Sequence, residues 1–225
     1  MSRSALLLGA TGLVGGLVLE RLLQRPEWSS ITLLGRRHPS IAADTDKIHR
    51  IDANLDQLSG HSQAFQVDDV FCCLGTTLRQ AGSREAFARV DLDYCVAAAE
   101  LARASGVQRF LMVSAVNANP RGVSFYARTK GEAERRIGEL GFPVTIFMQP
   151  SLLQGHRQEF RFGEEAGLKT LGLVMPLVRW SQADWLPVQA SAVADAMVSA
   201  ALHGPQQGIA RLRYRQIHQY AEQLE

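Results

Sequence analysis

The sequence predicts an α/β fold, a doubly wound parallel sheet with helices on both faces and a small irregular C-terminal cap. A glycine-rich turn at residues 9–15 follows an apolar run and precedes a helix-forming stretch. Apolar strands and amphipathic helices then alternate as far as residue 149. Residues 69–74 (DVFCCL) are a largely apolar strand of the kind that is buried on both faces of a parallel sheet. Right-handed crossovers between such strands place helices on both faces.

The first half of the chain is predicted from its apolar runs and the residues that break them. A strand at residues 4–9 leads into the glycine turn. A helix at residues 13–24 ends before Pro26, which cannot continue it. Three more apolar runs predict strands at residues 31–35, 47–52 and 69–74.

The second half begins with a long predicted helix at residues 84–104, whose apolar residues recur at helical spacing until Gly106 ends it. A strand, a helix and a strand follow at residues 109–114, 126–140 and 144–149. Residues 151–187 contain four glycines and two prolines, and they predict an irregular cap on the substrate side of the sheet. A helix at residues 191–202, a strand at residues 210–214 and a short terminal helix complete one predicted domain, residues 1–225.

Composition excludes several classes of function. The 225 residues are 46% hydrophobic and 20% charged with a net charge of +2, so nucleic acid is not an expected partner. Six scattered histidines lack ligand spacing, so no metal site is expected. No apolar stretch approaches the roughly 20 residues that cross a bilayer. Three cysteines make no disulfide framework, and we expect a cytoplasmic protein.

The glycine turn has the spacing that binds a dinucleotide. Gly9 lets the chain turn sharply out of the strand, and Gly12 lets the backbone approach a pyrophosphate. Gly15 lets the helix pack close to the sheet. The N–H groups at the start of the helix then face the phosphates. A bare turn is the alternative, but the strand before and the helix after it favour the binding motif.

Two arginines indicate which nicotinamide cofactor binds. Sites that prefer NAD carry an acidic residue about 20 positions after the glycine loop. Here Arg36 lies 21 positions after Gly15, followed by Arg37. A guanidinium can bind a 2′-phosphate in a bidentate manner, so we expect NADP(H). The alternative is that both are solvated loop charges.

Two further segments are predicted to line the cofactor site. Asp52 ends the third strand and could bond the adenine amino group, although a helix-capping Asp explains the residue almost as well. The loop after the fourth strand has a glycine that permits close approach to the ribose and pyrophosphate; its residues are Leu74, Gly75 and Thr76.

Three residues have the chemistry of carbonyl reduction. Tyr126 and Lys130 lie one helical turn apart on the same face, and Ser114 ends the preceding strand. A phenol can protonate the alkoxide that hydride transfer leaves, and a nearby ammonium stabilises the phenolate. Lys130 can also hold the nicotinamide ribose, while Ser114 orients the carbonyl oxygen. The alternative is a half-buried tyrosine beside a solvated lysine.

These residues resemble the short-chain dehydrogenases/reductases, in their atypical and extended branch of the Rossmann fold. The glycine spacing and the Ser114, Tyr126 and Lys130 set match that superfamily. Residues 72–77 and 87–94 are similar to the Tat-interactive-protein-like oxidoreductases. The resemblance implies that NADPH binds to the following residues: Gly9, Thr11, Gly12, Leu13, Val14, Arg36, Arg37 and Leu74 to Thr76, with Tyr126 and Lys130 at the nicotinamide.

One position departs from the family pattern. Many members use an Asn on the helix before the fifth strand in a proton relay, and the matching residue here is Asp91. We therefore expect an NADPH-dependent oxidoreductase for a small carbonyl or alcohol. A dinucleotide-binding regulator or redox sensor is the alternative, and an enzyme like the nucleotide-sugar epimerases is a weaker one. A homodimer through residues 84–104 is also possible, but packing on the sheet explains that apolar stripe equally well.

Overall fold

A seven-stranded parallel sheet forms the centre of the computed structural model, which describes residues 2–40, 46–155 and 184–224. Its strands, in chain order, are β1 Arg3–Leu8, β2 Trp28–Gly35, β3 Ile48–Asp52, β4 Asp69–Cys72, β5 Arg109–Val113, β6 Val144–Met148 and β9 Gly208–Leu212. A separate parallel pair joins β7 Leu153–Gln154 to β8 Val188–Gln189. Residues 156–183, most of the predicted cap, lie outside the described residues.

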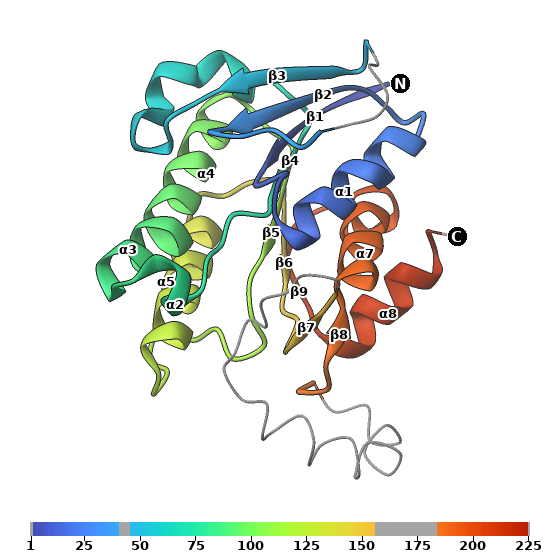
Figure 1. The fold of residues 1–225 in the computed structure, drawn as a ribbon. Coiled ribbons are helices and arrows are strands. Elements are labelled where there is room, and N and C mark those ends of the chain that lie inside the picture. The colour runs from blue at the N-terminus through green and yellow to red at the C-terminus, as the bar shows by residue number, and fades with distance from the viewer. Residues whose placement is uncertain (1, 41–45, 156–183, 225) are drawn as a thin grey trace.

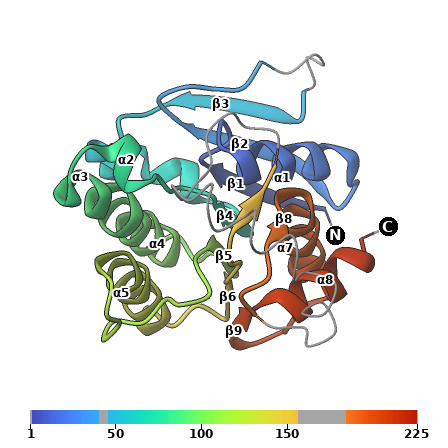
Figure 2. The same cartoon turned by 60° about the horizontal axis from the view of Figure 1, so that its bottom comes forward.

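Helices cover both faces of the sheet (Figures 1 and 2). The helical elements are α1 Leu13–Gln24, η1 Leu55–Phe65, α2 Leu78–Ala81, α3 Arg84–Ala88, η2 Arg89–Asp93, α4 Tyr94–Ala104, α5 Phe125–Glu139, α7 Ala190–His203 and α8 Tyr214–Glu222. On one face α1, α7 and α8 pack together, and on the other α4 packs against η1 and α5. The predicted doubly wound Rossmann fold is confirmed.

Alternating side chains of the strands supply two separate hydrophobic cores. In β1, Leu7 packs into the core beneath α1 and α7, while Leu6 and Leu8 pack into the core beneath η1, α4 and α5. This follows from the two-residue repeat of a strand, which sends successive side chains to opposite faces. All four residues of β4 are buried. Three of the four are apolar, and the buried carboxylate of Asp69 accepts from Nε1 of Trp28 at 2.8 Å, as burial on both faces of a central strand requires.

The strand order β3-β2-β1-β4-β5-β6-β9 places a switch point between β1 and β4. The chain leaves β1 toward β2 on one side and later enters β4 on the other. In an open α/β sheet, the crevice at the carboxyl ends of such strands is where ligands bind. The glycine turn follows β1 and the Cys73–Thr76 loop follows β4, so both predicted binding segments meet at this point.

The long helix predicted at residues 84–104 differs in one respect. The structure places a π-helical turn, Arg89–Asp93, between α3 and α4. The chain therefore stays helical, but this turn is wider than an α-helical turn because its hydrogen bonds join residues five positions apart. Such π turns occur frequently at functional sites. Periodicity alone predicted a regular α-helix, because one widened turn hardly alters the apolar spacing.

Backbone contacts hold the glycine turn in place. Gly9 has a φ of 82°, and a Cβ there would lie 2.5 Å from the carbonyl oxygen of Cys73. A Cβ on Gly15 would lie 2.1 Å from the carbonyl oxygen of Gly9. The first turn of α1 therefore packs against the end of β1 more closely than any side chain allows. Only glycine satisfies both positions.

We predict opposite effects for alanine at two adjacent glycines of α1. Gly15→Ala should lower the free energy of unfolding by about 2 kcal/mol, because backbone must move to admit the methyl group. At Gly16 the nearest atom to a new Cβ is 3.5 Å away, so Gly16→Ala should be neutral or stabilising by up to about 1 kcal/mol. Urea denaturation measures both. Equal stabilities for the two variants would contradict this packing.

Candidate dinucleotide-binding site

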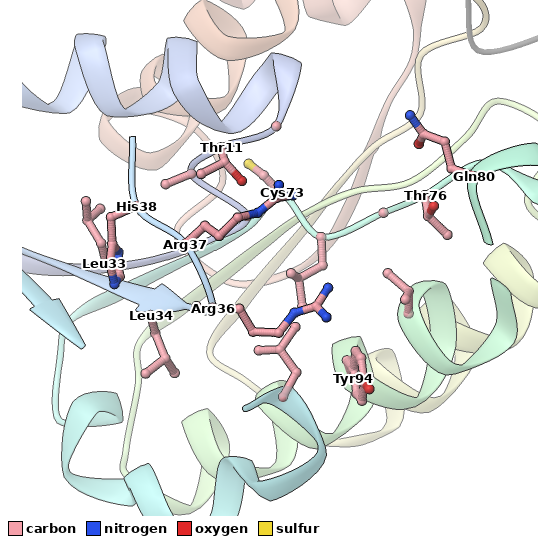
Figure 3. A pocket seen from close by; sticks show the side chains of 18 residues that line it. Thr11, Leu33, Leu34, Arg36, Arg37, His38, Cys73, Thr76, Gln80 and Tyr94 are labelled. Atoms are coloured by element: carbon pink, nitrogen blue, oxygen red, sulfur yellow. The ribbon is translucent and has the colours of Figure 1, made fainter. Parts of the chain in front are cut away.

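A cleft of about 750 Å³ lies at the switch point of the sheet (Figure 3). Three segments at the carboxyl ends of β1, β2 and β4 form most of its wall, and single residues from the helices close it. The lining consists of residues 9–12, 33–38 and 73–76 with Leu55, Gln80, Val90 and Tyr94. Sequence segments far apart in the chain thus meet around one space.

The N-terminus of α1 opens toward the cleft without a side-chain cap. Gly12 is the N-cap in extended conformation, no side chain bonds the first turn there, and that turn carries no acidic residue. Uncapped N–H groups and the helix dipole favour an anion. Leu13 is half-buried and Val14 and Gly15 are buried, so an anion here would meet backbone rather than side chains. This arrangement fits a pyrophosphate.

Arg36 and Arg37 follow β2 and line the cleft, and both are exposed. Within the described part of the chain, no carboxylate lies within ion-pair distance of either guanidinium. Both guanidinium groups are exposed at the cleft, where an anionic ligand can reach them. Figure 3 shows the two side chains on the wall that faces Thr11 and Thr76. Asp52 lies apart from this lining: its side chain is 90% exposed and one carboxylate oxygen is 3.1 Å from Nε2 of His38.

Asp91 connects the cleft to the predicted catalytic residues. Its Oδ2 accepts the backbone N–H of Thr76 at 2.8 Å, and Thr76 lines the cleft. Its Oδ1 lies 2.8 Å from Nζ of Lys130, and both side chains are buried. One carboxylate therefore joins three elements: η2, the loop after β4, and α5.

The ammonium of Lys130 is held in place by this contact. Burial alone would lower the pKa of Lys130, but the negative charge of Asp91 outweighs it and raises the pKa above the ordinary lysine value. Nζ also donates to the carbonyl oxygen of Val113 at 3.4 Å. Lys130 is thus charged at neutral pH, and its charge is balanced inside the protein.

Ser114 forms part of a second buried polar cluster. Its hydroxyl donates to Oε1 of Glu134 at 2.5 Å. Glu134 also accepts from Nε2 of Gln149 at 2.8 Å and from Nε of Arg211 at 2.9 Å. Because Glu134 accepts all three hydrogen bonds, the single proton of Ser114 is committed to it. The serine oxygen then offers only lone pairs to other groups.

Tyr126 lies in the first turn of α5, where the hydroxyl of Ser124 caps the helix by accepting the N–H of Ala127 at 3.1 Å. The tyrosine ring packs against Phe87 with 5.6 Å between ring centroids. Tyr126, Lys130 and Glu134 are spaced four residues apart, so all three share one face of α5. The sequence reasoning missed Glu134, although its position one turn after Lys130 was the available signal.

A parallel sheet with a glycine-lined, arginine-flanked cleft at its switch point defines a dinucleotide-binding Rossmann protein. The family model described as NAD(P)H-binding matches residues 9–204. The chain belongs to this NAD(P)H-binding family.

Known proteins agree with this assignment. Protein HTATIP2 of Rattus norvegicus is 36% identical over 173 residues, 76% of this chain and 71% of that protein. "Protein FMP52, mitochondrial" of Candida albicans is 32% identical over 209 residues, 89% of each chain. An NAD-bound short-chain dehydrogenase/reductase superfamily protein from Agrobacterium tumefaciens shares the fold, with a TM-score of 0.67 and 16% identity over 93% of this chain and 77% of that one. The resemblance to that superfamily and its Tat-interactive-protein-like branch is confirmed.

The expected cytoplasmic location is wrong in the light of these relatives, because the FMP52 proteins of several fungi are described as mitochondrial. The expectation rested on three cysteines without a disulfide framework. That pattern reports a reducing environment and does not distinguish one reducing compartment from another. Within the described residues, no helix combines the length and apolar content needed to cross a bilayer.

We predict that Asp91→Asn destabilises the protein by about 3–5 kcal/mol, because it leaves the Lys130 ammonium buried without its counterion. The amide oxygen of the asparagine can still accept the N–H of Thr76, so the loss of stability measures the effect of the missing negative charge. Asp93→Asn, an exposed change on the same turn, should cost less than about 0.5 kcal/mol. Urea denaturation measures both variants.

The same pair predicts a dependence on pH. Because the pKa of Lys130 is raised in the folded protein, its ion pair contributes fully to the free energy of unfolding at any pH below the lysine pKa of the unfolded chain. This contribution therefore stays constant between about pH 6 and 9. In Asp91→Asn, burial without the carboxylate lowers the lysine pKa, so the stability of the variant should rise with pH over that range. A variant whose stability matches wild type, with parallel pH profiles, would contradict the ion pair.

Proposed function

We propose that this protein is an NADPH-dependent oxidoreductase of the atypical short-chain dehydrogenase/reductase type, acting on a small carbonyl or alcohol. One observation carries the proposal: an uncapped helix N-terminus and two exposed arginines face a single cleft, and no carboxylate of the described residues lies within ion-pair distance of either arginine. These groups are what a pyrophosphate and a 2′-phosphate require. The membership in an NAD(P)H-binding family supports it.

In this proposal, each part of the cofactor binds to particular residues of the cleft. The N–H groups of the turn from Gly9 through Thr11 and Gly12 to Val14 would hold the pyrophosphate. Arg36 and Arg37 would bind the 2′-phosphate. The loop after β4 would pass beside the ribose and pyrophosphate, where the missing side chain of Gly75 permits close approach.

The chemistry would take place at the far end of the cleft, beyond Thr76. The nicotinamide supplies or accepts a hydride when it is bound. Tyr126 would donate the proton to the substrate oxygen in reduction and take it back in oxidation. Lys130 would stabilise the phenolate and hold the ribose, and Ser114 would orient the substrate oxygen once its hydroxyl turns from Glu134 toward the substrate. Asp91 fixes Lys130 and the Thr76 loop relative to each other.

A dinucleotide-binding regulator or sensor is the second candidate function, and two contacts favour it. The positive charge that Lys130 would lend to a phenolate is balanced by Asp91 at 2.8 Å. The proton that Ser114 would give to a substrate oxygen is donated to Glu134. A site in which the lysine charge is already balanced and the serine proton is already donated can bind a cofactor and still catalyse little.

We predict that NADPH binds at least tenfold more tightly than NADH near pH 7, a difference of about 1.4 kcal/mol. Arg36→Ala should remove most of this difference, because the alanine cannot contact a 2′-phosphate. Arg215→Ala, an exposed arginine on α8, removes the same charge away from the cleft and should keep the preference. Calorimetric titration measures each affinity. An unchanged preference in Arg36→Ala would overturn the 2′-phosphate assignment.

The enzyme and regulator proposals differ in one measurement. Stopped-flow oxidation of NADPH against a panel of small aldehydes and ketones should show turnover that falls by at least about 100-fold in Tyr126→Phe. The variant keeps the ring that packs on Phe87 and should bind NADPH as wild type does. Tight NADPH binding with no Tyr126-dependent oxidation of any panel member would contradict the enzyme and support the regulator.

A further inference from the structure

His38 lies beside the two arginines and was not assigned a role from the sequence. It follows Arg37 directly, lines the same cleft, and its side chain is 15% exposed. Its ring Nε2 lies 3.1 Å from Oδ1 of Asp52, whose side chain is 90% exposed. Figure 3 shows the imidazole on the wall formed by the end of β2. The ring is thus held between the cleft and an exposed carboxylate.

Backbone pairing fixes the position of Asp52. β2 and β3 run parallel with Gly35 opposite Asp52, and the N–H of Ala53 donates to the carbonyl oxygen of Gly35 at 3.0 Å. The carboxylate therefore stands at the strand end, next to the segment that carries the two arginines. A negative charge next to this segment is unfavourable for a bound 2′-phosphate, because like charges repel each other.

We propose that Arg36, Arg37 and His38 together form the 2′-phosphate subsite, and that protonation of His38 against Asp52 makes the preference for NADP(H) over NAD(H) depend on pH. This inference rests on the proposed function of the cleft. A protonated imidazole adds a third positive charge and neutralises Asp52. A neutral imidazole leaves the negative charge of Asp52, just outside the cleft, uncompensated by His38.

Other charged groups around the imidazole do not reproduce this effect. Imidazole is the ordinary side chain that changes charge between pH 5 and 8. Arg36 and Arg37, on the same segment, stay charged throughout that range. Across the cleft, the hydroxyl of Tyr94 donates to Asp56 at 2.6 Å. Burial and, to a smaller extent, this hydrogen bond raise the pKa of Tyr94 above its ordinary value. Cys73 contributes the remaining titratable side chain of the described lining.

The experiment compares NADPH and NADH affinities by calorimetry at pH 6.0 and 8.5, at constant ionic strength. The 2′-phosphate itself takes up a proton, and so loses negative charge, as the pH falls through about 6. The NADPH/NADH affinity ratio is therefore measured for wild type and for His38→Gln, and the first ratio is divided by the second. Titration of the ligand affects both ratios equally and cancels in this quotient. We expect this quotient to be about tenfold at pH 6.0 and close to one at pH 8.5.

Two more variants sharpen the test. His38→Lys carries a permanent charge and should keep the high NADPH preference at both pH values. Asp52→Asn should raise the preference at pH 8.5, because it removes the charge that repels the phosphate. A quotient that is the same at both pH values, or a lower preference in Asp52→Asn at pH 8.5, would overturn the proposal.

Failure of this inference is distinct from failure of the proposed function. NADPH binding that depends on Arg36 but shows parallel pH profiles in wild type and His38→Gln would overturn the role of His38 alone. Absence of any NADPH preference at both pH values, with no effect of Arg36→Ala, would overturn the NADPH assignment and this inference with it. Thermal unfolding of each variant confirms that affinities are compared between folded proteins.

Discussion

The carboxylate of Asp91 is the contact on which the geometry of the site depends. It lies on a π-helical turn, accepts the backbone N–H of Thr76, and pairs with the buried ammonium of Lys130. The cleft wall and the helix that carries Tyr126 are thereby tied to the same side chain. A buried ion pair costs desolvation energy and is weak evidence for stability. Its effect here is positional, because it fixes the far end of the cleft relative to α5.

A second constraint acts at the other end of the cleft, where the glycine turn leaves β1. Backbone packs directly on backbone at Gly15 and Gly9, because a Cβ there would lie only 2.1 and 2.5 Å from a carbonyl oxygen. The close packing aims the uncapped N-terminus of α1 at the switch point between β1 and β4. The fold therefore supplies the anion site through main-chain groups, and the side chains of β2 add the charge that distinguishes one cofactor from another.

Much of this arrangement could be predicted from the sequence. Apolar runs and breakers located the seven main strands and the bounds of α1, because burial on both faces leaves a strong pattern. The short α2 and η1 were missed, since they carry few apolar residues in a regular repeat. The π turn was missed because one widened turn hardly disturbs helical spacing. Contacts such as Ser114 with Glu134 depend on tertiary packing, which no local pattern encodes.

The side chains at the site illustrate the same limit. The sequence predicted that Tyr126 and Lys130 share a face of one helix, which spacing alone determines. It did not predict that Lys130 is buried against Asp91 or that His38 meets Asp52, because each pair joins residues from different elements. An aspartate at position 91, where many family members have asparagine, suggested an altered proton relay. Its contacts show that the Asp91 carboxylate balances the charge of Lys130 inside the protein. Residue type thus predicted the chemistry, and packing decided which groups remain available for it.

The most direct test of the account is a crystal structure of the protein with NADP⁺. We predict the pyrophosphate against the backbone N–H groups at the start of α1, the 2′-phosphate between Arg36 and Arg37, and the nicotinamide beyond Thr76 toward Tyr126. A dinucleotide bound with its 2′-phosphate away from both arginines, or outside this cleft, would contradict the account.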